Sequence, residues 1–212
     1  MRLFTCKGIP VRLHASFMWF IGIIILFQIV SSGLPAGLEV ASVLFMLFGS
    51  VILHELGHAL VGQAFGVLTK EIVLTPIGGI ALLDRHLDNS RAEIWIAIAG
   101  PVVNFILVAL SMPLLFITNT NWVSYFIMVN IMLGVFNLIP AFPMDGGRIL
   151  RALLAKKYGY RDATLMALKV SKVFGVLFIG VGIFYSIMLS IIGIFLLLTS
   201  NRHEHLTKSG YL

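Results

Sequence analysis

The sequence has few charged residues and a single cysteine. Only 11% of its 212 residues are charged, whereas 59% are hydrophobic and the mean hydropathy is +1.01. Soluble domains contain roughly 45–50% apolar residues, so this composition excludes a cytosolic globular protein. The lone Cys6 excludes an internal disulfide and a multi-cysteine metal site. Any bound metal must therefore be held by His, Asp or Glu.

The apolar residues form runs of about the twenty residues that a helix needs to cross a bilayer. The four clear runs are Ala15–Val30, Val40–Phe65, Ile94–Ile117 and Trp122–Ile139. Residues 165–199 are long enough for two further helices joined by a turn near Gly182–Ser186, with one long tilted helix as the alternative. We therefore predict an all-α polytopic membrane protein with about six transmembrane helices.

The positions of the 15 basic residues predict the orientation of these helices. The connectors at 31–39, at 118–121 and near 182–186 contain no Lys or Arg, whereas the basic residues lie in or beside the other exposed segments. With six spans, the positive-inside rule places both termini in the cytoplasm. The net charge of +6 fits contact with anionic lipid rather than with nucleic acid. We expect a multi-pass protein of the cell membrane with the lipid bilayer, and no nucleic acid, as its partner.

The connector between the second and third spans is predicted to contain a β-hairpin. In the connector from Gly66 to about Glu93, the short apolar runs 71–75 and 79–83 flank Pro76-Ile77-Gly78, a turn signal, and predict a β-hairpin at the cytoplasmic side.

We expect a single transmembrane domain over residues 1–212. Its core comprises 8–151, its last two helices 164–200, and a short cytoplasmic tail 201–212, in which His203 and His205 are expected to be solvated. Regulation would then require a partner acting in trans.

The second span contains His54-Glu55-Leu56-Gly57-His58. Two histidines at i and i+4 lie on one face of a helix and can hold one metal ion, while the glutamate beside them can act as a base. Ionisable side chains at membrane depth are costly without a role. The pattern therefore predicts a metal centre rather than a structural cluster.

A catalytic zinc site needs a third protein ligand. Asp145 is the other acid in membrane-associated sequence far from a cytoplasmic loop, and it lies between Pro140/Pro143 and Gly146-Gly147. The prolines are expected to kink the fourth helix, and the glycines to permit conformations closed to other residues. Broken backbone at membrane depth is tolerated where it lines a cavity or is buried in protein. The alternative is that this segment is only the cytoplasmic exit of the fourth span.

Together these motifs resemble those of the site-2 proteases, which are intramembrane zinc metalloproteases. The motifs occur in family order between Gly8 and about Arg151. They are Gly8–His14, H-E-L-G-H, Gly78–Ala81, Ala99-Gly100-Pro101 with Asn104, and the N-x-x-P-x-x-P-x-D-G-G pattern in Asn137–Arg148. The sequence resembles a minimal form of the family, without PDZ or nucleotide-sensing domains.

The resemblance implies one zinc ion per chain, held by His54, His58 and Asp145, with Glu55 as the catalytic acid/base. It also implies cleavage of a single-pass membrane protein within or near its transmembrane segment, that is, regulated intramembrane proteolysis. Asn137 is expected either near the substrate, as a hydrogen-bond donor to the oxyanion, or in a hydrogen bond to another helix. Asn104 is expected to contact either the substrate backbone or another helix.

The function predicted from the sequence is therefore that of a zinc metalloendopeptidase. A metal-ion transporter is one alternative, but it would use Glu55 as a ligand, and no paired halves are visible. A catalytically silent membrane binding partner is the other alternative, although all four residues of the minimal catalytic set are present.

Overall fold

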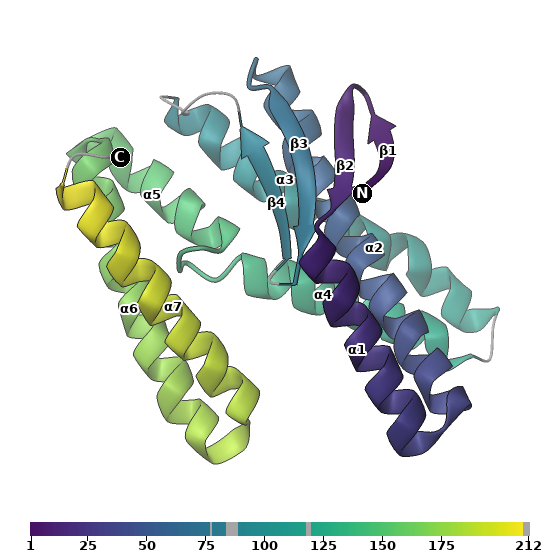
Figure 1. The fold of residues 1–212 in the computed structure, drawn as a ribbon. Helices are drawn as coiled ribbons and strands as arrows, with labels where there is room; N and C mark the ends of the chain where they lie inside the picture. The colour runs from purple at the N-terminus through teal and green to yellow at the C-terminus, as the bar shows by residue number, and fades with distance from the viewer. Residues whose placement is uncertain (77, 84–88, 118–119, 210–212) are drawn as a thin grey trace. The chain divides into compact units, whose positions relative to one another are not determined.

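The computed structural model describes residues 1–76, 78–83, 89–117 and 120–209, with the backbone alone over 80–83. Helices and four short strands make up the described chain (Figure 1). It divides into two compact units, which are described separately. The first unit comprises residues 1–86 and 99–134, and the second comprises residues 87–98 and 135–212.

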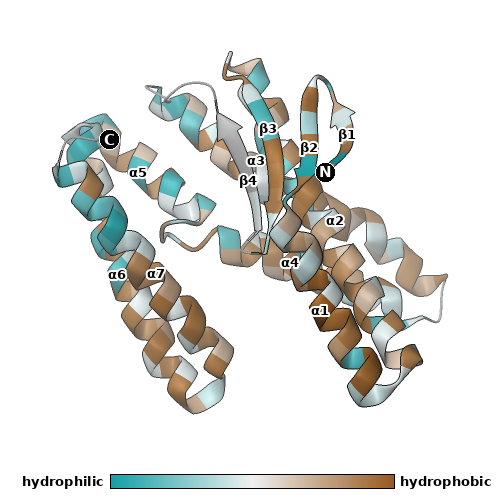
Figure 2. Cartoon of the chain, viewed as in Figure 1, coloured by the Kyte–Doolittle hydropathy of each residue, from teal (hydrophilic) through white to brown (hydrophobic). Residues whose placement is uncertain are grey.

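Six helices coincide with the six predicted spans. They are α1 (Ala15–Ser32), α2 (Leu34–Ala64), α3 (Ser90–Ser111), α4 (Asn121–Asn137), α6 (Tyr160–Tyr185) and α7 (Ile187–Lys208). In the described chain, four segments are long and apolar enough to cross a membrane: α1, α2, α6, and α3 together with the short helix η1 (Met112–Phe116). The 17-residue α4 is a shorter apolar helix. Figure 2 shows the hydrophobic character of these helices, and the prediction of a helical polytopic membrane protein is confirmed.

The last two helices form a hairpin with a sharp break at Ser186. This position confirms the predicted turn and excludes one long helix. A Cβ built on Gly193 would lie 2.6 Å from the carbonyl oxygen of Gly175, so the two helix backbones approach closely at these glycines. Helix α7 continues to Lys208, so most of the predicted tail is helical.

The first unit contains a four-stranded sheet in the order β1 (Arg2–Cys6), β2 (Ile9–Leu13), β3 (Thr69–Thr75), β4 (Gly78–Leu83). The antiparallel β3–β4 pair confirms the predicted hairpin, although Ile77 in its turn lies outside the described residues. The sequence analysis missed β1 and β2. These strands are joined through Lys7 and Gly8, whose φ angles of 44° and 86° suit a two-residue hairpin turn. Strand β2 then pairs with β3 in parallel.

The sheet fixes the position of the C-terminal third of α2. Alternate side chains of β2 and β3 point to one face of the sheet, and there Ile9, Val11 and Ile72 pack against Leu56 and Ala59 of α2. Both helix residues lie within two positions of a histidine of the H-E-L-G-H motif. The sheet therefore holds the helical turn that carries this motif.

The second unit contains an additional helix, α5 (Asp145–Tyr158), between α4 and α6. Phe142, just before α5, packs with Leu150, Ala167 and Leu168, and its backbone N–H donates to Ser171 Oγ over 2.7 Å. Both contacts fix the segment that leads into Asp145.

The prediction for the proline and glycine residues around Asp145 needs two corrections. Pro140 and Pro143 do not kink a helix, because α4 ends at Asn137 and both prolines lie in the non-helical connection to α5. Gly146 and Gly147 do not adopt positive φ. A Cβ on Gly146 would lie 2.3 Å from the carbonyl oxygens of Leu138 and Ile139. The glycines are therefore needed for the close approach of two backbone segments.

Candidate metal centre

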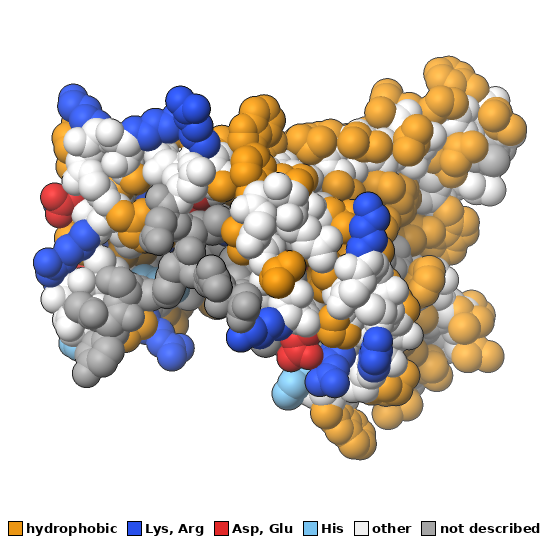
Figure 3. Space-filling view, turned by 90° about the horizontal axis from the view of Figure 1, so that it is seen from above, with side chains coloured by type: hydrophobic (Ala, Val, Ile, Leu, Met, Phe, Trp, Pro, Cys, Tyr) orange, Lys and Arg blue, Asp and Glu red, His pale blue; other side chains and the backbone are white. Residues whose placement is uncertain are grey.

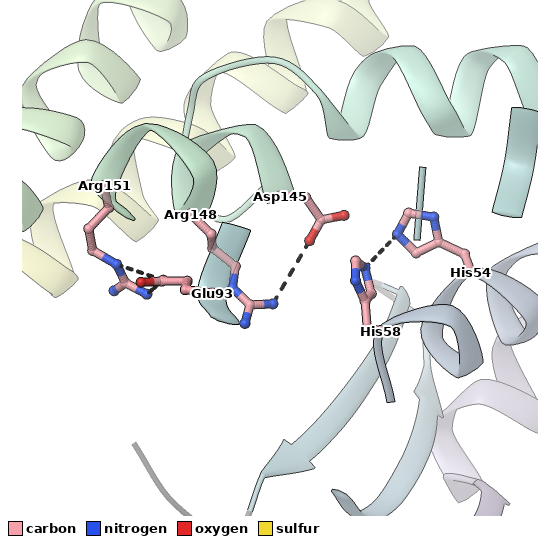
Figure 4. Close-up of polar contacts among 6 residues, drawn as sticks. All are labelled: His54, His58, Glu93, Asp145, Arg148 and Arg151. Atoms are coloured by element: carbon pink, nitrogen blue, oxygen red, sulfur yellow. Dashed lines mark hydrogen bonds and ion pairs between the residues drawn. The ribbon is translucent and has the colours of Figure 1, made fainter. Parts of the chain in front are cut away.

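His54 and His58 form a buried pair on one face of α2. Their exposed fractions are 5% and 6%, and their Nε2 atoms lie 3.0 Å apart (Figure 4). The helical i, i+4 spacing brings both imidazoles to the same point, as the sequence predicts.

The absence of a side chain at Gly100 of α3 allows the backbone of α3 to approach this pair closely. A Cβ on Gly100 would lie 2.3 Å from His58 Nε2 and 2.6 Å from His54 Nε2. Two nitrogens bound to one tetrahedral zinc ion at about 2.0–2.1 Å are about 3.3 Å apart, close to the separation observed here. The separation of the two Nε2 atoms therefore fits a metal ion such as zinc.

Glu55 follows His54 on α2, and its side chain lies against strand β4. A Cβ on Gly79 would be 2.6 Å from Glu55 Cγ and 3.2 Å from Glu55 Oε1. Any larger residue at this position of β4 would displace the carboxylate. The structure thus places the Glu55 side chain, the predicted base, against strand β4 of the predicted hairpin.

Asn104 is fully buried on α3 and contacts His54. Its Oδ1 lies 2.6 Å from His54 Nδ1, and its Nδ2 donates to Asn130 Oδ1 over 2.9 Å. Asn104 was expected to contact either the substrate backbone or another helix, and the structure shows its hydrogen bonds to residues of two other helices, α2 and α4. The sequence analysis missed Asn130 and Ser50, although each is a polar residue within an apolar run.

Asp145 lies in the second unit as the first residue of α5 and is buried. Its Oδ1 is 3.9 Å from Arg148 Nη1, one turn later (Figure 4). A carboxylate at a helix N-terminus is stabilised by the helix dipole. Asn137 is the last residue of α4 and is half-buried.

The second unit also contains a buried ion pair that the sequence analysis missed. Glu93, in the first turn of α3, is fully buried, and Arg151 of α5 donates to its Oε1 from Nε over 3.0 Å and from Nη2 (Figure 4). The Arg151 guanidinium also lies 5.1 Å from the ring centroid of Phe142 and 4.7 Å from that of Tyr160. The sequence signal was an acidic residue bordering an apolar run.

His203 does not have the solvated position expected for it. Its ring is half-buried and stacks on Phe142, with the centroids 6.3 Å apart. Burial lowers the pKa of His203, and the positive charges of Arg151 and Arg202 lower it further.

Comparisons with known proteins show which proteins this chain is similar to. The model of peptidase family M50 matches residues 42–120 and 115–179, more than half of the chain. A zinc metalloprotease of Methanocaldococcus jannaschii is 46% identical over 178 residues, which are 81% of this chain and 50% of that protein. Stage IV sporulation protein FB of Bacillus subtilis is 28% identical over 167 residues, which are 76% of this chain and 58% of that protein. The chain thus spans about half the length of these curated relatives.

A solved structure matches over nearly the whole length of both chains. It is the site-2 protease from Methanocaldococcus jannaschii, with a TM-score of 0.74, 36% identity, and coverage of 96% of this chain and 94% of that chain. The chain is therefore a multi-pass membrane protein of peptidase family M50, with the fold of a site-2 protease.

Proposed function

We propose that this protein is an intramembrane zinc endopeptidase. It hydrolyses a peptide bond within or near the transmembrane segment of a single-pass membrane protein. The observation that carries this proposal is the buried His54/His58 pair, whose Nε2 atoms lie 3.0 Å apart against the backbone of Gly100, with Glu55 on the same helical turn.

The proposed zinc ligands are His54, His58 and Asp145, with one ion per chain. The family resemblance supports Asp145, and so does its burial at the start of α5. A zinc ion held there would bring the pKa of a bound water to about 7 and polarise the scissile carbonyl. The fourth coordination position of such a site is left to water.

The proposed role of Glu55 is proton transfer. Its carboxylate takes a proton from the attacking water and later delivers that proton to the leaving amine, so one group serves as base and then as acid. The position of Glu55 beside Gly79 limits the space available to its side chain. Asn137 is the proposed hydrogen-bond donor to the oxyanion.

The proposed substrate binds as an extended segment. A helical substrate must unwind locally before its amides are accessible, and an edge strand can pair with the unwound backbone. Strand β4 ends the described sheet, and its Gly79 lies against Glu55. A substrate strand added to β4 would thus run close to the proposed base.

The proposed location is the cell membrane, with both termini in the cytoplasm. The distribution of Lys and Arg among the connectors supports this orientation. A regulatory partner acting in trans is part of the same proposal.

The proposal is tested by measuring zinc and proteolysis in the same detergent-purified samples. Wild type and Glu55→Gln should each contain about one zinc ion per chain, because the substitution leaves the ligands in place. Cleavage of fluorescently labelled single-pass membrane proteins should fall by about 10²-fold or more in Glu55→Gln, the range of general acid–base catalysis. His54→Ala, the control for the metal, should lose zinc.

Three results would overturn the proposal. They are folded wild type without zinc, proteolysis at the wild-type rate in Glu55→Gln, and zinc uptake into proteoliposomes by wild type that is lost in Glu55→Gln.

A further inference from the structure

Three polar residues from three helices are buried in the interior of the first unit. Ser50 of α2 is 1% exposed, and Asn104 of α3 and Asn130 of α4 are 0% exposed. Helices in a membrane gain no hydrophobic stabilisation from association, so polar side chains between them act chiefly through hydrogen bonds. Hydrogen bonds join Ser50 to Asn130 and Asn130 to Asn104, and Asn104 in turn contacts His54. These three polar residues are together called the polar chain.

The backbone carbonyl of Phe126 determines which group donates and which accepts in each hydrogen bond of the polar chain. Asn130 Nδ2 donates to the carbonyl oxygen of Phe126 over 2.9 Å and to Ser50 Oγ over 3.0 Å. A carbonyl oxygen only accepts, so the NH₂ group of Asn130 must face Phe126, and its Oδ1 must face Asn104. Asn104 Nδ2 then donates to that Oδ1 over 2.9 Å.

Because the NH₂ group of Asn104 faces Asn130, its carbonyl oxygen Oδ1, which can only accept a hydrogen bond, faces His54. Asn104 Oδ1 lies 2.6 Å from His54 Nδ1, and an amide oxygen cannot donate a proton. His54 Nδ1 must therefore carry the hydrogen and donate it. In the neutral ring the other nitrogen, Nε2, then carries a lone pair instead of a proton, and Nε2 is the atom that lies beside His58 Nε2 and Gly100.

We propose that the polar chain positions His54 for metal binding by fixing both its tautomer and its ring orientation. This inference rests on the zinc site of the proposed function. Histidines that bind metals usually donate their second nitrogen to a fixed acceptor, and loss of that acceptor typically lowers metal affinity 10–100-fold. A neutral amide performs this task here, so the membrane interior gains no further charge.

A purely structural role for the polar chain makes a different prediction. If Asn104 only joined α2, α3 and α4, its loss would lower stability without changing the tautomer of His54 or the affinity of the folded protein for zinc. The two roles are therefore separated by measurements on the ring itself and on zinc binding.

The first measurement is the ¹⁵N NMR spectrum of histidine-labelled, metal-free wild type at a pH where the ring is neutral, with His54 assigned by its absence in His54→Ala. We expect the Nδ1–H tautomer. This measurement needs no variant of the polar chain and does not depend on zinc, so it remains informative even if the proposed peptidase activity is wrong. An Nε2–H tautomer would overturn the inference.

The second measurement is the zinc dissociation constant, obtained by competition with a chelating dye. Asn104→Leu removes the acceptor and should raise this constant 10–100-fold. Asn104→Asp restores an acceptor oxygen and should bind zinc more tightly than Asn104→Leu. The control is Ser111→Ala on the same helix, because Ser111 Oγ donates to its own helix at Leu107.

Unchanged zinc affinity in Asn104→Leu, with a lowered melting temperature of the metal-free protein, would show that the polar chain is structural and would overturn the inference. Absence of zinc from wild type would instead overturn the proposed function. The two failures are thus distinguishable.

Discussion

Gly100 contributes to the candidate metal centre through the side chain that it lacks. Gly57, within the H-E-L-G-H motif of α2, also lies close to α3, since a Cβ on Gly57 would be 2.9 Å from the carbonyl oxygen of Ala99. Glycines on both helices thus allow α3 to pass directly over the H-E-L-G-H motif. The same approach brings Asn104, one helical turn after Gly100, to His54.

We predict that Gly100→Ala lowers zinc affinity by about tenfold or more, at least the loss seen when a supporting contact of a metal site is removed. The new methyl group would lie 2.3 Å from His58 Nε2 and 2.6 Å from His54 Nε2, so both imidazoles would have to move. The zinc dissociation constant, obtained by competition with a chelating dye, is the measurement. Gly49→Ala on α2 is the control, because a Cβ at that position has no neighbour within 4 Å, and wild-type zinc affinity in Gly100→Ala would contradict the assignment.

The residues of the site differ in how far the sequence predicts them. His54, Glu55 and His58 are predictable because helix geometry alone brings them together. The hydrogen bonds among Ser50, Asn104 and Asn130 cannot be predicted in this way. They depend on how three helices are rotated about their axes, and the sequences of these helices are apolar on every side.

The start of α3 and the helix α5 are joined by the Glu93–Arg151 ion pair. The second carboxylate oxygen of Glu93 has no hydrogen-bond partner among the described residues. Arg151 is therefore the group that compensates the buried charge, and it also contacts the rings of Phe142 and Tyr160.

We predict that Arg151→Leu lowers the free energy of unfolding by about 3–5 kcal/mol, the range for breaking a buried ion pair and leaving one charge uncompensated. Denaturant titration in mixed micelles is the measurement. The double variant Arg151→Leu/Glu93→Gln should recover part of the loss. Lys156→Leu, an exposed position on α5, is the control, and equal effects of the two leucine variants would contradict the prediction.

At the cytoplasmic end predicted for the last hairpin, Glu204 of α7 binds Lys172 of α6, and it lies 2.6 Å from Lys208 of α7. Hydrogen bonds from Lys172 and then from Lys208 lower the pKa of Glu204 to about 2. The depressed pKa means that these contacts stabilise the fold fully above the unfolded pKa, about 4.3, and that the stabilisation is lost as pH falls toward 2.

We therefore predict that Glu204→Gln is less stable than wild type at pH 7 and that the difference shrinks between about pH 4.3 and pH 2. Melting temperatures measured over this range at low salt test the prediction. High salt should reduce the difference at pH 7, because the pair is partly exposed. A difference independent of pH would show that the charge of Glu204 has no part in it.

The sequence predicted one half of the sheet and missed the other for a physical reason. Strands β3 and β4 are close in sequence and flank a recognisable turn, whereas β2 pairs with a strand that follows two long helices. Hydrophobic periodicity reports local structure, so long-range pairing leaves little trace in it.

At the scale of the whole molecule, the parallel β2–β3 pair constrains the membrane topology. The two strands are hydrogen-bonded and must lie on the same side of the bilayer, so the chain between them crosses the membrane an even number of times. Helices α1 and α2 lie between these strands and are each long and apolar enough to span. The sheet thus supports two crossings before residue 69.

We predict that a fluorescent reporter active only in the cytoplasm is active when fused to either terminus and inactive when fused after Ser32, between α1 and α2. Fluorescence of whole cells is the measurement. An inactive C-terminal fusion, with an intact protein on immunoblots, would indicate an odd number of spans and contradict the proposed orientation.

The same strand pairing has a consequence for the order of events during synthesis. Val11 of β2 pairs with Ile72 of β3, so at roughly 5–20 residues per second the N-terminal hairpin waits roughly 3–12 s for its partner strand. Cross-linking of Arg12→Cys with Val73→Cys, which face each other in the register, in ribosome-bound chains of increasing length would time this step. The sheet thus closes only after the first two helices have been made, and it can close only while its two strands lie on the same side of the membrane.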